Sequence, residues 1–170
     1  MQSHGPRIEV SVAQQTLRVL DPDNHLLAEY PVSTSKFGLG TEVGSFKTPT
    51  GQFAVANKIG GNEPTNTIFQ GRKPVGRLTP KGPEFTAPER ELADDEDLPN
   101  TDDLVVSRIL WLQGTEIHNA NTHERYIYIH GTNQENLIGT PASHGCVRMR
   151  NSDVANLYDQ IHAGTPVTIA

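Results

Sequence analysis

The sequence is poor in several features that define whole classes of protein. It contains one cysteine, Cys146, so an internal disulfide framework is excluded. Aromatic residues make up only 6%, and no apolar run reaches the length of a membrane-spanning helix. Fourteen Lys and Arg stand against twenty Asp and Glu, which gives a net charge of −6. Because these basic residues form no cluster in the sequence, a nucleic-acid partner is not expected.

The N-terminal residues 1–7 lack the basic start and the apolar run of a secretory signal. The sequence as written therefore predicts a cytoplasmic protein. A chain from which a leader had been removed would read the same, and that chain would belong in the periplasm or the cell wall.

Short strands and turns dominate what is present. The length suits a single domain over residues 1–170, and fifteen Gly with twelve Pro favour a mainly β fold. Alternating apolar and polar residues, or dense runs of β-branched and aromatic residues, mark the strands. They are predicted at 8–12, 16–20, 26–32, 47–55, 104–112, 125–129 and 166–169.

Two other segments differ from this pattern. Residues 151–161 place apolar side chains at helical spacing after the candidate capping residues Asn151, Ser152 and Asp153, which predicts one helix. Residues 60–103 break every periodic pattern and are rich in proline. A long loop of this kind indicates either a flap over a cleft or a solvated insertion.

The segment around Cys146 combines the groups that a cysteine nucleophile needs. His130 ends an apolar strand and precedes Gly131, so its imidazole is a candidate general base. His144 is a second candidate, because residues two apart on an extended chain share a face. Gly145 between His144 and Cys146 would let a substrate carbonyl approach the backbone amides.

Two other interpretations of the same residues stay open. A lone cysteine is most often a small buried apolar residue, although Ser143, His144 and Gly145 are poor core residues. A zinc site is the other, because histidine and cysteine are its usual ligands, yet the spacing matches no common zinc motif. Its candidate ligands would be His118, His123, His130, His144 and Cys146.

Three motifs together resemble the L,D-transpeptidase (YkuD-like) catalytic domain. They are Ile129-His130-Gly131-Thr132, Ile138-Gly139 and Ser143-His144-Gly145-Cys146-Val147-Arg148-Met149. The N-terminal strands and the turn at residues 47–53 also resemble that family in order and spacing. The resemblance implies a β-sandwich of mixed sheets with one helix in the C-terminal half, and a long flap loop over the cleft.

The resemblance also implies a chemistry on the stem peptides of peptidoglycan. Cys146 would attack the carbonyl that joins L-diaminopimelate to D-alanine, and a thioester would form as D-alanine leaves. His130 would take the thiol proton, and the carbonyl of Gly131 would hold its tautomer. The expected oxyanion and substrate contacts are His144, Gly145, Ser143, Arg148 and Tyr128, and Arg148 would pair with a substrate carboxylate. No cofactor and no metal are expected.

An amine could resolve the thioester and form a cross-link or an exchanged D-amino acid. Water could resolve it instead, which would make the protein an L,D-carboxypeptidase. The missing leader favours water and a soluble muropeptide as substrate, as in peptidoglycan recycling. A non-catalytic module that binds wall peptides is the alternative outside enzymes, and a zinc-dependent hydrolase is the alternative within them.

Overall fold

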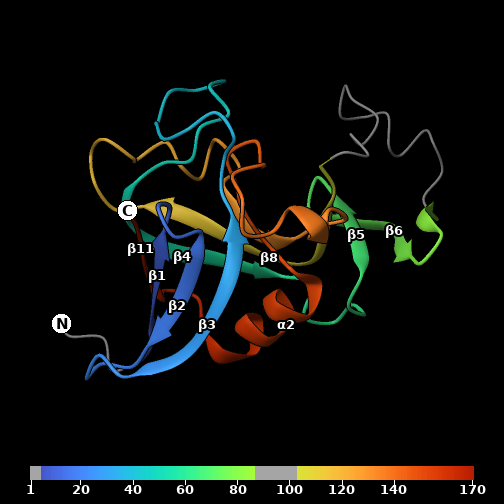
Figure 1. Cartoon of the computed structure of the whole chain (residues 1–170), viewed down its shortest axis with the longest axis horizontal. Helices are drawn as coiled ribbons and strands as arrows, with labels where there is room; N and C mark the ends of the chain where they lie inside the picture. The colour runs from blue at the N-terminus through green and yellow to red at the C-terminus, as the bar shows by residue number, and fades with distance from the viewer. Residues whose placement is uncertain (1–4, 87–102) are drawn as a thin grey trace.

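The computed structural model describes residues 5–86 and 103–170. Within them lie strands, one 3-10 turn and one α-helix, arranged as in Figure 1. The strands are β1 (Arg7–Ser11), β2 (Thr16–Leu20), β3 (Leu26–Ser33), β4 (Gly51–Ile59), β5 (Thr67–Gln70), β6 (Lys73–Thr79), β7 (Gly82–Phe85), β8 (Val105–Gly114), β9 (Tyr128–Gly131), β10 (Val147–Met149) and β11 (Pro166–Ile169). The 3-10 turn is η1 (Glu135–Leu137) and the helix is α2 (Asn151–Gln160).

The strands form one mixed sheet that closes on itself. Its order is β4-β11-β1-β2-β3-β10-β9-β8, and β8 pairs with β4 to complete the ring. The β1–β11 and β9–β10 pairs are parallel, whereas the other pairs are antiparallel. The two layers of the expected sandwich are therefore joined at both edges, and the mainly β prediction is confirmed.

The N-terminal strands follow the alternation in the sequence. β1 and β2, at the first two predicted strands, form a hairpin and pair antiparallel from Arg7 opposite Leu20 to Ser11 opposite Thr16. The alternate residues Ile8, Val10 and Leu17 are buried and join the main apolar core. Because side chains alternate between the two faces of a strand, this pattern sets which face turns inward.

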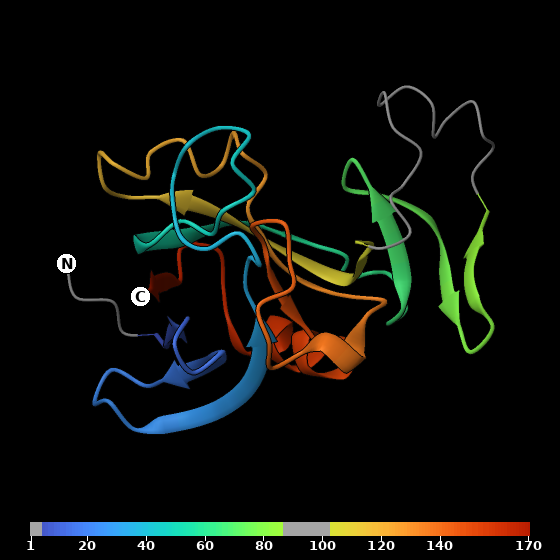
Figure 2. The ribbon, with the colours of Figure 1, turned by 45° about the horizontal axis from the view of Figure 1, so that its top comes forward.

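Residues 60–103 differ from the prediction of a structureless excursion. Residues 67–85 form the strands β5, β6 and β7, which extend the sheet beyond β8 and stand to one side of the ring in Figure 2. The strands are short, and a bulge lies between Ile68 and Phe69. Such interruptions hide the alternation by which strands are recognised. The rest of the expected flap, residues 87–102, lies outside the described residues.

Two strand boundaries also differ from the prediction. The strand expected at residues 125–129 runs instead from Tyr128 to Gly131, because Tyr126 has a φ of +57°, which an extended strand cannot contain. The strand expected at residues 47–55 begins only at Gly51 and continues to Ile59. Residues 34–50, here called the β3–β4 loop, lie before it and reach the candidate site.

The helix α2 begins one residue after its cap, Arg150, so the three expected capping residues occupy its first turn. Asn151 is buried and bonds elsewhere, since its amide donates to the Thr132 carbonyl at 2.8 Å and its side-chain oxygen accepts from Ser107 at 2.8 Å. Val154 and Leu157 join the core within the sheet. The helix thereby holds the segment after β9 against β8.

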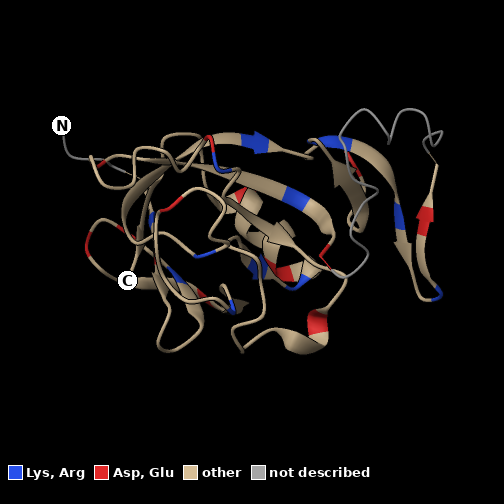
Figure 3. Ribbon diagram, turned by 90° about the horizontal axis from the view of Figure 1, so that it is seen from above, with Lys and Arg blue, Asp and Glu red and all other residues tan. Residues whose placement is uncertain are grey.

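Charged residues of both signs are distributed over the elements, as Figure 3 shows. No helix in the described part of the chain is long and apolar enough to cross a membrane.

Candidate active site

The parallel pairing of β9 with β10 places Cys146, the residue before β10, next to the strand that carries the expected base. In its register Val147 lies opposite Ile129 and Arg148 opposite His130. Val147 and Ile129 belong to the main core. Because neighbouring residues on a strand point to opposite faces, His130 and Arg148 project away from that core. Cys146, two residues before Arg148, lies at the start of the same outer face.

The sulfur of Cys146 lies against the backbone that leads into β9. The Tyr128 N–H donates to Sγ at 3.3 Å, and the thiol donates to the Tyr126 carbonyl at 3.4 Å. The residue is half-buried, and it packs beside Phe69, Ile109 and Tyr128. Burial raises the pKa of the Cys146 thiol to about 12, although the Tyr128 N–H acts to lower it. At rest Cys146 is therefore a neutral thiol, which would need a base to act as the expected nucleophile.

His130, the expected base, has its tautomer set by the backbone. Its Nδ1 contacts the carbonyl oxygen of Gly131, as the resemblance implied. Because a carbonyl only accepts, Nδ1 carries the proton and Nε2 keeps its lone pair. The residue is 2% exposed and lies within β9, not at its end. Burial lowers the pKa of His130, while Asp103 and the Gly131 carbonyl act in the opposite direction.

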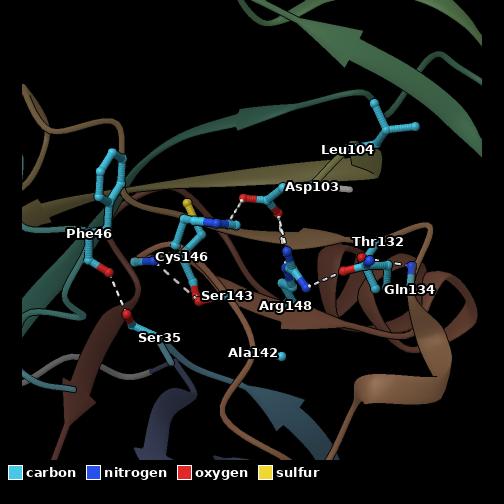
Figure 4. Close-up of polar contacts among 12 residues, drawn as sticks. Ser35, Phe46, Asp103, Leu104, Thr132, Gln134, Ala142, Ser143, Cys146 and Arg148 are labelled. Carbon is cyan, nitrogen blue, oxygen red and sulfur yellow. Dashed lines mark hydrogen bonds and ion pairs between the residues drawn. The ribbon is translucent and has the colours of Figure 1, made fainter. Parts of the chain in front are cut away.

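Asp103 also belongs to the site, although no motif or periodic pattern indicated it. Its Oδ2 lies 2.8 Å from Nδ1 of His144, and its Oδ1 accepts from Arg148 Nε at 3.0 Å and Nη2 at 2.6 Å. Figure 4 shows Asp103 between Cys146 and Arg148. Burial acts to raise the pKa of Asp103, but His130, Arg148 and His144 outweigh it and lower the pKa. The site therefore holds a carboxylate anion.

Arg148 has a different place from the one expected. Its side chain is 1% exposed, and its guanidinium binds Asp103 and, through Nη1, the Gln134 side chain at 3.0 Å. The face of Arg148 that was expected to meet a substrate carboxylate is thus occupied by Asp103. His144, the alternative base, is held by the same carboxylate through Nδ1.

Hydrogen bonds from two hydroxyl groups stabilise the turn before Cys146. Ser143 Oγ donates to the Cys146 carbonyl at 2.6 Å and accepts the Gly145 N–H at 3.2 Å. Gly145 has a φ of +124°, a conformation that favours glycine. Thr48 of the β3–β4 loop donates to the Gly145 carbonyl at 2.9 Å and accepts the Ser35 N–H at 3.0 Å. Since the Gly145 amide is engaged, its expected oxyanion role stays a prediction.

The β3–β4 loop brings aromatic groups to the site and is bound by a cation from outside the loop, Arg125. Arg125 donates to the carbonyls of Lys47 at 2.7 Å and Gly40 at 3.2 Å, which ties the loop to the chain before β9. Its charge acts to lower the pKa of the Cys146 thiol, against the larger effect of burial. The rings of Phe37 and Phe46 lie 5.9 and 6.0 Å from that of His144.

Tyr128, an expected substrate contact, is largely buried at 8% exposure. Its hydroxyl accepts a hydrogen bond from Arg72 at 3.1 Å. Neither Arg72 nor Asp103 was found from the sequence, because both lie in the stretch without periodicity.

The candidate zinc ligands are not gathered at one point. His118 bonds the Thr50 carbonyl at 3.0 Å, and His123 bonds Asn57 at 2.9 Å and stacks on Trp111. Across residues 5–86 and 103–170, a group of three potential metal ligands within 4.8 Å of one another occurs only at Asp21, Asp23 and His25. That group is a surface turn in which Asp21 accepts backbone N–H groups.

Sequence comparisons agree with this geometry. A family model, YkuD, described as the L,D-transpeptidase catalytic domain, matches residues 5–169. YqjB of Bacillus subtilis, named as an L,D-transpeptidase, is 46% identical over 48 residues, which are 28% of this chain and 27% of that protein. YbiS of Escherichia coli, named likewise, is 49% identical over 43 residues, 25% of this chain and 14% of that protein. The matches therefore span much less than two thirds of either relative.

Solved structures agree in fold at low identity. An L,D-transpeptidase from Mycobacterium smegmatis has a TM-score of 0.57 at 19% identity, over 97% of this chain and 58% of that one. The catalytic domain of the E. faecium L,D-transpeptidase has a TM-score of 0.54 at 16% identity and full coverage of both chains. LdtMt1, solved in complex with imipenem, has a TM-score of 0.56 at 17% identity, over 98% of this chain and 59% of that one. Since the family model covers nearly all of the sequence, the protein belongs to the YkuD L,D-transpeptidase catalytic domain family and is an L,D-transpeptidase family enzyme.

Proposed function

We propose that this protein cleaves the bond between L-diaminopimelate and D-alanine in peptidoglycan stem tetrapeptides and transfers the acyl group to an amine. The family's description as L,D-transpeptidase supports an amine as acceptor in place of the water favoured from the sequence. The observation that carries the proposal is the contact between His130 Nδ1 and the Gly131 carbonyl, on the strand next to Cys146. That contact leaves Nε2 as the basic nitrogen of a neutral imidazole beside a neutral thiol. This pairing suits a nucleophile that is activated only when substrate binds.

In the first half-reaction His130 Nε2 takes the proton of the Cys146 thiol as sulfur bonds to the scissile carbonyl carbon. The carbonyl becomes an oxyanion, which backbone N–H groups of the turn before β10 would stabilise. The C–N bond then breaks, and the imidazolium returns its proton to the amine of the leaving D-alanine. A thioester on Cys146 and a neutral His130 remain.

In the second half-reaction an acceptor amine attacks the thioester carbonyl, and His130 takes a proton from it. The C–S bond breaks, the thiolate recovers the proton from His130, and a new amide bond is formed. Water in place of the amine would yield the tripeptide acid, so the acceptor decides between a cross-link and hydrolysis.

Intact mass spectrometry after exposure to imipenem tests the nucleophile. We expect a single adduct on the protein and none on Cys146→Ala. His130→Ala should keep the fold and acylate more slowly by about 10²- to 10⁴-fold, the usual contribution of a general base. The matched control is His162→Ala, because His162 is exposed and lies outside the site. An adduct on Cys146→Ala would overturn the assignment.

Incubation with the tetrapeptide, with and without a D-amino acid acceptor, tests the reaction. We expect release of D-alanine and an exchange product that depends on the acceptor. If the tripeptide is the main product even in the presence of the acceptor, the protein is a hydrolase and the proposed transfer to an amine is wrong. Release of D-alanine by Cys146→Ala would exclude the thioester route altogether.

A further inference from the structure

An arginine outside the signature motifs lies at an unusual backbone position near the thiol. Gly71 and Arg72 form the two-residue turn between β5 and β6, with φ values of +53° and +64°. Two successive left-handed residues define the type I′ turn, which favours glycine or asparagine. An arginine there costs conformational energy, so the position of its side chain calls for an explanation.

Three aromatic residues hold the guanidinium of Arg72. Its Nη1 donates to the Tyr128 hydroxyl at 3.1 Å, and its central carbon lies 4.6 Å from the ring centroid of Trp111 and 5.3 Å from that of Tyr126. Stacking of this kind fixes the plane of the guanidinium while leaving other N–H donors on its edge.

A cavity of about 270 Å³ opens beside this group, lined by Gly71, Arg72, Tyr126 and Tyr128. The same two tyrosines hold the sulfur of Cys146, one through its N–H and the other through its carbonyl. The cavity and Cys146 therefore share these two tyrosines, and a substrate whose carbonyl reaches Sγ would extend past Tyr128 toward Arg72.

Within residues 5–86 and 103–170, no carboxylate forms an ion pair with Arg72, whereas Arg148 is neutralised by Asp103. Arg72 is half-buried, which makes an unneutralised charge costly. Its planar fork is complementary to a carboxylate, which could bind through two parallel hydrogen bonds. Arg148 is already occupied by Asp103, whereas Arg72 lines the cavity and can take up an anion there.

We propose that Arg72 binds a carboxylate of the stem peptide in the cavity beside Cys146 and so selects substrates with a free acid at that point. This rests on the proposed function. The two residues that flank the scissile bond each offer one such group, the terminal carboxylate of D-alanine and the side-chain carboxylate of diaminopimelate. Both have the chemistry that the guanidinium recognises.

The test compares Arg72→Gln with the wild type on three tetrapeptides: the free acid, the C-terminal amide and the peptide amidated on the diaminopimelate side chain. Arg72→Gln should lower kcat/KM for the free acid about 10- to 100-fold, mainly through KM, because a hydrogen-bonded charge pair is lost. The wild type should show a similar loss when the recognised carboxylate is amidated. On that amide the variant and the wild type should be equal, which identifies the carboxylate.

Arg77→Gln on β6 is the matched control, because Arg77 is exposed and belongs to the same hairpin. It should leave all three rates unchanged. A merely structural Arg72 would lower stability without altering the ratio between acid and amide. If neither amidation changes the ratio of wild type to Arg72→Gln, the proposal is overturned.

If the wild type releases no D-alanine, the proposed function fails and binding decides the role of Arg72. Calorimetric titration of the tetrapeptide into Cys146→Ala, and into a double variant that carries both Cys146→Ala and Arg72→Gln, measures binding without the reaction. It therefore tests the carboxylate site of Arg72 independently of D-alanine release. Weaker binding by the double variant, and only for the free acid, supports the carboxylate site. Equal affinity for both proteins rejects it.

Discussion

The carboxylate of Asp103 meets the guanidinium of Arg148 at two points, 3.0 Å from Nε and 2.6 Å from Nη2, although 45 positions separate the two residues. Because the same carboxylate bonds His144, it ties a residue before Cys146 and a residue after it to the chain before β8. Arg148 lies within β10, and Asp103 lies two residues before β8.

Asp103→Asn should destabilise the protein by about 3 kcal/mol, because it leaves the buried charge of Arg148 without its anion. Urea unfolding measures the change. Glu84→Gln, an exposed position on β7, is the control and should be neutral within about 0.5 kcal/mol. Equal unfolding midpoints for Asp103→Asn and the wild type would contradict the inferred role of the pair.

The same pair predicts a loss of stability in acid. The pKa of Asp103 is lower in the folded protein than its ordinary value of 3.8, so folding favours the ionised form. The resulting stabilisation is fully present above that ordinary value and is lost as pH falls through the lower folded pKa. The free energy of unfolding should therefore drop below about pH 4, and the drop should be shallower in Asp103→Asn. Parallel pH profiles for the two proteins would show that Asp103 is not responsible.

Alkylation of Cys146 should be slow at neutral pH in the free enzyme. Its thiol has a pKa raised to about 12 by burial, against an ordinary value of 9.0, so little thiolate is present. The rate of reaction with iodoacetamide should rise about tenfold per pH unit through the mildly alkaline range, without a plateau. The unfolded protein in urea should instead reach its plateau near the ordinary pKa. A plateau at neutral pH in the folded protein would indicate a resting thiolate.

Thr48→Val should disturb the turn before Cys146, although the valine side chain has nearly the volume of threonine. The buried hydroxyl serves both the Gly145 carbonyl and the Ser35 N–H, and valine leaves both without that partner. We expect a loss of about 1–3 kcal/mol in stability and slower acylation by imipenem. Thr50→Val, in the same loop, is the matched control. An unchanged acylation rate in Thr48→Val would show that the β3–β4 loop does not maintain the reactive geometry of the turn.

The candidate catalytic residues could be predicted because they lie in short motifs of the sequence. The run from Ser143 to Met149 and the dipeptide His130-Gly131 carry their own pattern, and the structure places both on neighbouring strands. The N-terminal hairpin and α2 were predictable for the same reason, since alternation and helical spacing are short-range signals. Sequence by itself thus determined the mainly β class, the family and the candidate nucleophile with its base.

Tertiary structure alone decided what surrounds that nucleophile. Asp103 is the last residue of the stretch without periodicity. In the folded protein it lies just before β8 and binds Arg148, so the guanidinium that was expected to bind substrate is already occupied. Arg72 reaches Tyr128 only because β5 pairs with β8 and turns sharply into β6. Burial, which raises the pKa of Cys146 and lowers that of His130, is a property of the packed sheet. Long-range pairing and desolvation depend on the whole chain, and no local pattern encodes either of them.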